Sequence, residues 1–296
     1  MGMTSPSLPP RIFDLSLIRK RILRANAAPA NQFLLDRLQD DMVDRLYLVQ
    51  RSFTSVLDVG SITSTLLARL KDKYKPDIAH HLGLLEHNGI PHISSETLIT
   101  QEFLNLKPQS YDLIVSNFAL HVVNDLPGIL VQIRQALKPD GLFLACILGG
   151  QSLQELRSSL TQAEAELKGG TAPRIAPFAD VRDLGLLLQR AGFTLPVADK
   201  DTLLIRYPHM FKLVQDLRSL AASNPLKIET RMPLTRSVIA RCAEIYAHKF
   251  ADQDNRIRAT FDIIWISGWA DHESQQKPLK PGSAKIHLSQ VLPDRS

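Results

Sequence analysis

Three nearly continuous apolar runs, separated by segments of helical periodicity, constrain the fold of this chain most strongly. They are Ser55–Gly60, Tyr111–Ser116 and Gly141–Leu148. An apolar run without polar alternation is typical of a parallel strand that is buried on both faces. Because strands alternate with helices across residues 54–148, we predict an α/β, Rossmann-like fold in which helices cover both faces of a mostly parallel sheet.

Further elements are predicted around this region. Weaker strands are expected at 78–82 and 92–93, a strand pair around 193–206, and a long strand at 256–269. The helical segments are 31–50, 63–73, 125–137, 151–167, 178–191, 208–222 and 235–249. A turn with proline and glycine in favoured positions, Lys138–Gly141, is expected between the helix at 125–137 and the third strong strand.

Composition excludes several classes of protein. The chain has 296 residues, 44% of them hydrophobic, which is enough to bury a core. A net charge of +5 is small for a dedicated nucleic-acid binder, so we expect no such partner. Two cysteines, Cys146 and Cys242, are too few for a disulfide framework or a thiolate metal site, and the histidines lack metal-binding spacing. No apolar run approaches the ~18 residues of a transmembrane segment.

A basic amphipathic segment, Arg11–Arg24, precedes the predicted sheet. Such a segment can be a transit peptide, a membrane-surface helix or a docking helix. The alternative is a helix that packs on the domain and keeps its charges in water.

Two strand ends are candidates for a binding site, because open α/β sheets bind ligands beyond the carboxyl ends of their strands. The first is the turn Asp58–Ser64, in which Gly60 is the only glycine. Alone it is equally compatible with a structural loop. The second is Ser116–Asp125, where a buried strand leads into a helix.

Together with Leu137–Gly141, the segment Ser116–Asp125 resembles class I S-adenosylmethionine-dependent methyltransferases. Three later blocks, 149–193, 207–225 and 267–278, resemble one branch of that superfamily. It contains the mitochondrial complex I assembly factor that acts as an arginine hydroxylase, with its bacterial relatives, and lies near the malonyl-acyl-carrier-protein methyltransferases.

This resemblance implies a seven-stranded sheet, S-adenosylmethionine as cofactor, and a protein partner such as a respiratory complex I subunit. That partner would be modified by methyl transfer or arginine hydroxylation. Residues 51–274 would form the methyltransferase-like (type 11) domain, after a basic and helical segment at 1–50 and before a loose tail at 275–296.

The resemblance also implies roles for individual residues. Asp58, Gly60, Ser116 and Asn117 match cofactor-binding positions. His121 lies where the family places residues that border the reacting centre. A histidine there could act as a general base, or the block around it could instead cap and pack the following helix.

The sequence departs from the family pattern at three recognition elements. Side chains fill two glycine positions of the turn, an apolar residue replaces the acidic residue that binds the ribose, and a neutral residue replaces the one that meets the adenine. These residues are Ile62, Ser64, Leu82 and Thr100. Loss of the cofactor site is the favoured interpretation, giving a non-catalytic assembly or binding protein. The alternative is an altered but working site in which Glu86 or Glu102 compensates.

The family's core opens at Ile12–Asp14, which leaves only Met1–Arg11 ahead of it. That is short for a transit peptide, so we expect a bacterial cytoplasmic protein. The alternative is the matrix face of the inner mitochondrial membrane. Peripheral membrane contact through 11–24 remains compatible with either.

Overall fold

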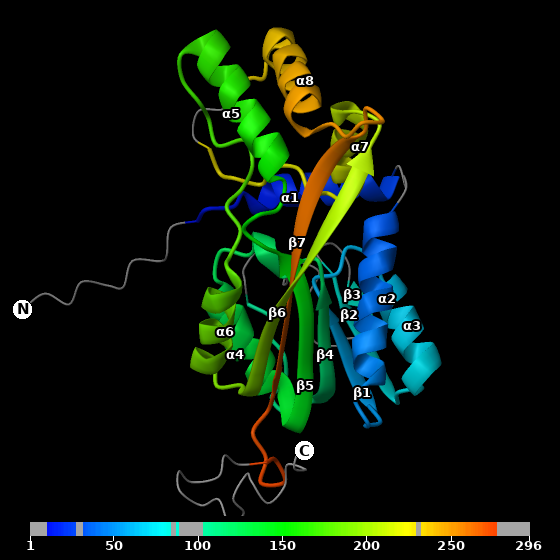
Figure 1. Cartoon of the computed structure of the whole chain (residues 1–296). Coiled ribbons are helices and arrows are strands. Elements are labelled where there is room, and N and C mark those ends of the chain that lie inside the picture. Colours follow the sequence, from blue (N-terminus) through cyan, green and yellow to red (C-terminus); the bar gives the residue numbers. More distant parts are fainter. Residues whose placement is uncertain (1–10, 28–31, 84–86, 89–102, 229–231, 277–296) are drawn as a thin grey trace, which may run out of the picture.

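A computed structural model describes residues 11–27, 32–83, 87–88, 103–228 and 232–276. Seven strands form one sheet in the order β3-β2-β1-β4-β5-β7-β6 (Figure 1). Their bounds are β1 Ser55–Val59, β2 Ile78–Leu82, β3 His87–Asn88, β4 Tyr111–Asn117, β5 Leu137–Leu148, β6 Thr194–Tyr207 and β7 Ile257–Trp269. β1, β2, β4 and β5 are parallel, whereas β7 is antiparallel to both of its neighbours and β3 to β2. The predicted α/β fold is confirmed.

Helices cover both faces of the sheet (Figure 1). Their bounds are α1 Leu15–Ala27, α2 Phe33–Tyr47, α3 Thr65–Tyr74, α4 Leu126–Ala136, α5 Gln154–Lys168, α6 Val181–Arg190, α7 Met210–Ser219 and α8 Arg236–Phe250. Val56 of β1 packs into the core under α2 and α3, and its neighbour Leu57 packs into the core under α4 and α6. Successive side chains point to opposite faces of a strand, so both must be apolar, which explains the continuous apolar run.

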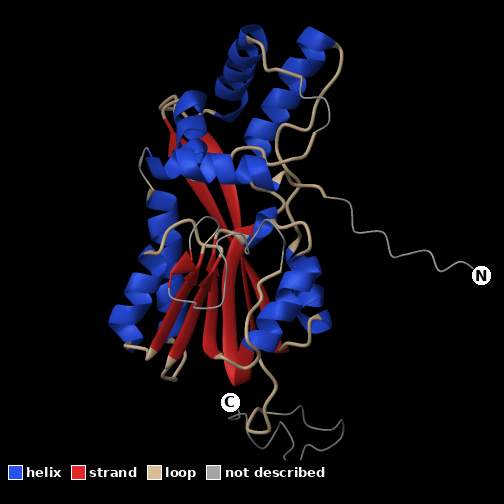
Figure 2. Cartoon of the chain, turned by 180° about the vertical axis from the view of Figure 1, so that it is seen from behind, coloured by secondary structure: helices blue, strands red, loops and turns tan. Residues whose placement is uncertain are grey.

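β6 and β7 are longer than the other strands and extend past them (Figures 1 and 2). The extension is covered by α5, α7 and α8, whose buried residues include Leu213 and Tyr246. This part therefore adds a helical layer beyond the carboxyl ends of β4 and β5. That layer is what encloses the candidate site.

Two predictions from the sequence are wrong. The pair of strands expected around 193–206 is one strand, β6, because the backbone irregularity at Leu195 shifts its register against β7 without reversing the chain. The turn expected at Lys138–Gly141 belongs to β5, which already begins at Leu137. Asp140 adopts a left-handed φ of 63°, and β4 and β5 shift register there, so this stretch is a bulge within the strand.

The expected strand at 92–93 and nearly all of the tail at 275–296 lie outside the described residues.

The basic segment before the sheet packs onto the domain as α1. Ile18 and Ile22 are buried under the loop that follows α7. The chain just before α1 pairs with the same loop: Asp14 N–H donates to the Pro225 carbonyl at 2.9 Å, and Lys227 N–H donates to the Ile12 carbonyl at 2.8 Å. Within the described part of the chain, no helix combines the length and apolar character needed to cross a membrane.

Candidate functional site

The turn after β1 is organised around a buried carboxylate. Asp58 is fully buried, and its Oδ2 lies 3.0 Å from Nδ1 of His81, the residue directly opposite on β2. The Ser61 hydroxyl donates to the other carboxylate oxygen. Both oxygens are therefore engaged by side chains of the protein itself. Through these two hydrogen bonds, Asp58 fixes the conformation of the turn.

Gly60 gives the turn its direction. Its φ is 78°, in the left-handed region that favours glycine, and its N–H donates to the Leu82 carbonyl at 2.7 Å. The hydroxyl of Ser61 also accepts from the Asn117 N–H at 3.2 Å, which connects this turn to the end of β4. The structure thus brings Asp58, Gly60 and Asn117 together at one edge of the sheet, as predicted.

The end of β4 carries two buried polar side chains. The Asn117 side-chain oxygen accepts from the Cys146 thiol of β5 at 3.0 Å. Ser116 is also buried, and its hydroxyl has no hydrogen-bond partner among the described residues. Asp125 is the N-cap of α4, with its carboxylate accepting from the Gly128 N–H at 2.9 Å, so the end of this block does cap the following helix.

His121 lies in a short 3-10 helix after β4, Leu120–Val122, and lines a cavity of about 240 Å³. Its ring packs edge-on against Phe118 at a centroid distance of 4.9 Å and approaches Phe178 at 6.1 Å. Burial lowers the pKa of His121 to about 4, and Nδ1 has no partner among the described residues. The imidazole is therefore neutral at physiological pH. Its ring lines the cavity, and its Nδ1 is buried without a hydrogen-bond partner among the described residues. Because the His121 ring lines a cavity, its position is not explained by capping of the following helix alone.

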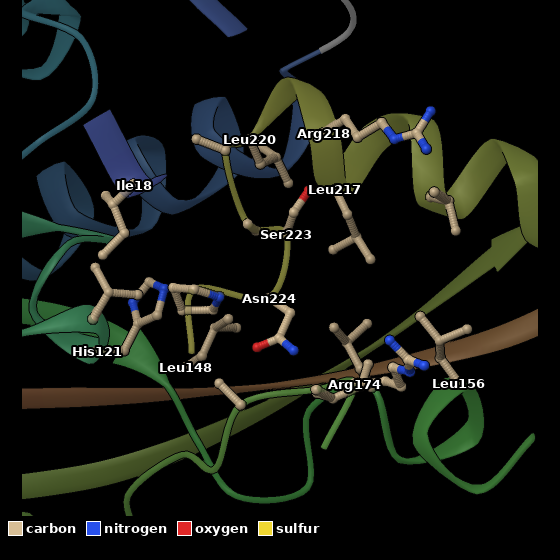
Figure 3. Close-up of a pocket in the computed structure, with 18 of the residues that line it drawn as sticks. Ile18, His121, Leu148, Leu156, Arg174, Leu217, Arg218, Leu220, Ser223 and Asn224 are labelled. Atoms are coloured by element: carbon tan, nitrogen blue, oxygen red, sulfur yellow. The ribbon is translucent and has the colours of Figure 1, made fainter. Parts of the chain in front are cut away.

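The cavity walls come from several separate parts of the chain. In Figure 3, His121 and Leu217 point into the cavity from opposite sides, while Arg218 extends away from it. The apolar walls are Ile18, Ile22, Ile62, Leu148, Leu153, Leu156, Leu160, Val214, Leu217 and Leu220. Of the described residues that line the cavity, none carries a carboxylate.

The arginine in the cavity wall, Arg174, has its charge matched. Its Nε lies 2.8 Å from the carboxylate of Glu164, which is almost fully buried. Burial acts to raise the pKa of Glu164, but hydrogen bonds from Arg174 and the Ala172 N–H together bring that pKa below its usual value. The pair seals this side of the cavity as a neutral unit.

The cavity was not predicted from the sequence. Most of its lining residues lie in two of the blocks that carried the family resemblance, Gly149–Phe193 and Tyr207–Pro225. Helical periodicity identified the individual helices. No local pattern indicated that α1, α5 and α7 meet over His121.

The described residues fit only part of a class I cofactor site. The family's first glycine is present as Gly60, and the end of β4 carries the polar residues Ser116 and Asn117. By the sequence resemblance, Leu82 takes the position of the ribose carboxylate and Ile62 a glycine position. Leu82 is fully buried in the apolar core, and Ile62 lines the cavity. The described residues therefore fit such a site at Gly60 and at the end of β4, and they do not fit it at Ile62 or at its ribose end. Glu86, Thr100 and Glu102 lie outside the described residues.

A family model described as a methyltransferase domain matches residues 30–196. The arginine-hydroxylase NDUFAF5, mitochondrial, of Homo sapiens is 37% identical over 98% of this chain and 86% of its own length. The malonyl-[acyl-carrier protein] O-methyltransferase of Xylella fastidiosa is 30% identical over 88% of this chain and 89% of its own length. Among solved structures, the YcgJ protein of Bacillus aligns with a TM-score of 0.49 and 13% identity, covering 80% of this chain and 99% of that one.

Proposed function

This chain belongs to the methyltransferase-domain family, whose cofactor is S-adenosylmethionine, and from this premise we propose that it modifies a group carried by a protein partner. The relatives support two chemistries. One group is named for arginine hydroxylation, and the other for methyl transfer to malonyl-[acyl-carrier protein]. The partner implied by the sequence resemblance is a subunit of respiratory complex I.

The observation that carries this proposal is the cavity beside His121. It lies next to the strand ends where α/β enzymes hold their ligands. A volume of about 240 Å³ is below the range of about 300–1,000 Å³ typical of pockets for whole small molecules. It therefore suits one side chain or one short chain presented from outside.

We assign the residues as follows. Gly60, Ser116 and Asn117 would contact the cofactor, and Asp58 holds their turn in place through His81 and Ser61. S-adenosylmethionine supplies an electrophilic methyl group when bound. Because the ribose end does not fit, we assign the protein only a proton-transfer role: neutral His121 accepts a proton from the group in the cavity.

A calorimetric titration with S-adenosylmethionine and S-adenosylhomocysteine tests this proposal. Micromolar binding supports the enzyme, and absence of heat at millimolar ligand contradicts it. Gly60→Ala should weaken binding because it adds a side chain in the turn. Gly192→Ala is the matched control, since Gly192 also has a positive φ, of 85°, and has open space around it. Mass spectrometry of a co-incubated complex I subunit then detects the modification.

A second candidate is a non-catalytic assembly protein that keeps the fold without the cofactor. The engaged carboxylate of Asp58 and the buried Leu82 favour it. It predicts tight binding of the partner protein without any mass change in that partner.

We place the protein in the bacterial cytoplasm, with the matrix face of the mitochondrial inner membrane as the alternative. α1 would make any peripheral membrane contact through its exposed basic residues. Fractionation of cells that express a tagged full chain distinguishes the two locations.

A further inference from the structure

A groove separates α1 from α7 on the outside of the helical layer. It is lined by Arg21, Arg24, Ala25, Gln215, Arg218, Ser219 and Ser223. Three of these residues are arginines. None of the described residues that line the groove carries a carboxylate.

Two of the arginines have guanidinium groups without a partner among the described residues. Arg24 and Arg218 are exposed, and neither guanidinium has an ion pair or hydrogen bond to a described residue. Arg21 has a different role: it donates to the carbonyl of Ser223 at 2.7 Å and to that of Asn224, which fixes one wall of the groove. Like charges on adjacent helices repel, so an anion between Arg24 and Arg218 would be favourable.

The groove and the cavity share residues. Arg218 and Ser223 line both. In Figure 3, Leu217 points into the cavity, while the guanidinium of the next residue, Arg218, extends away from it. One turn of α7 therefore presents an apolar side chain inward and a cation outward.

We propose that the groove binds the anionic group, carboxylate or phosphate, of a ligand whose apolar part occupies the cavity. Guanidinium groups suit both anions because they donate paired hydrogen bonds. The cavity has no carboxylate for a cationic group, and its walls favour an apolar chain. This inference rests on the proposed function only in taking the cavity as the place where the substrate is held.

Calorimetric titration of the full chain with octyl phosphate tests the proposal. Octyl phosphate should bind at least about tenfold more tightly than 1-octanol, the factor expected from a single charge-assisted hydrogen bond. It should also bind more tightly than inorganic phosphate, which has no apolar chain to bury in the cavity. The double substitution Arg24→Gln and Arg218→Gln should remove that advantage. Arg19→Gln is the matched control, because Arg19 is an exposed arginine of α1 outside the groove. A parallel titration with octanoate identifies whether carboxylate or phosphate is preferred.

Equal binding of octyl phosphate and 1-octanol would overturn the proposal. So would equal binding of octyl phosphate by the double variant, or binding of phosphate alone as tightly as octyl phosphate. Failure of the proposed function has a different signature, since it is seen as an unmodified partner protein while octyl phosphate still binds. A modified partner without octyl phosphate binding would reject this inference alone.

Discussion

Oδ2 of Asp58 on β1 lies 3.0 Å from Nδ1 of His81 on β2, and both side chains are buried. The carboxylate has no solvent to stabilise it, so its two hydrogen-bond partners, His81 and Ser61, must do so. This arrangement makes the turn after β1 a rigid unit. Both Asp58 oxygens are bonded within the protein.

Replacing His81 should therefore destabilise the fold. His81→Phe leaves a buried carboxylate with one of its partners missing, so we expect the free energy of unfolding to fall by about 3 kcal/mol. Urea denaturation at neutral pH measures it. His272→Gln serves as the control, since His272 is exposed and the described hydrogen bonds of its side chain are to nearby Ser274. A loss of less than about 0.5 kcal/mol for His81→Phe would mean that the pair does not stabilise the turn.

His121 should make the fold sensitive to acid. Burial lowers its folded-state pKa to about 4, below the unfolded value of 6.5. Between these values the unfolded chain binds more protons, so stability falls as the pH decreases from 6.5 toward 4. Between pH 7 and pH 5 the free energy of unfolding should fall by up to about 2 kcal/mol, and by less to the extent that solvent reaches the ring.

Urea denaturation of the wild type and of His121→Gln at both pH values isolates this effect. The variant should lose less stability than the wild type on acidification, because glutamine does not titrate. Parallel pH dependence in the two proteins would show that His121 is not buried as a neutral imidazole.

The sheet was predictable because its signal is local. Each apolar run, such as Val56–Val59, reflects burial on both faces at every position. His80 and His81 are neighbours on β2, so strand alternation points their side chains to opposite faces, and they bond to different partners, Tyr111 and Asp58. That His81 faces Asp58 depends on the register between β1 and β2, which no local pattern encodes.

The cavity was not predictable for the same reason. Ile18, His121 and Leu217 meet there, although they are about a hundred residues apart in sequence. Each is an ordinary apolar or polar position in its own helix. The sequence predicted the long strand at 256–269, but how far β6 and β7 extend past the other strands depends on their register, which no local pattern encodes.

Removing the side chain at Ile62 should improve cofactor binding. Ile62 occupies a position where the family carries glycine, and its side chain lines the cavity next to the turn. Ile62→Gly opens the approach of a ligand to Gly60, and we expect S-adenosylmethionine to bind about tenfold more tightly, equivalent to about 1.4 kcal/mol. Calorimetry measures this, with Ile239→Gly, in α8 away from the turn, as the control. Unchanged affinity would show that the ribose end, not Ile62, limits binding.

Arg21 should control how firmly α1 closes over the cavity. Its guanidinium donates to the Ser223 and Asn224 carbonyls, joining α1 to the loop after α7. Arg21→Gln removes these charge-assisted bonds. We therefore expect the free energy needed for α1 to detach locally from the loop to fall by about 1–3 kcal/mol. Hydrogen exchange should then accelerate in Leu15–Ala27 and stay unchanged in the buried strand β4. Arg19→Gln, which removes an equal charge from the exposed side of the same helix, should leave both rates unchanged. Equal acceleration in the two variants would attribute the effect to helix charge rather than to the contact with the loop.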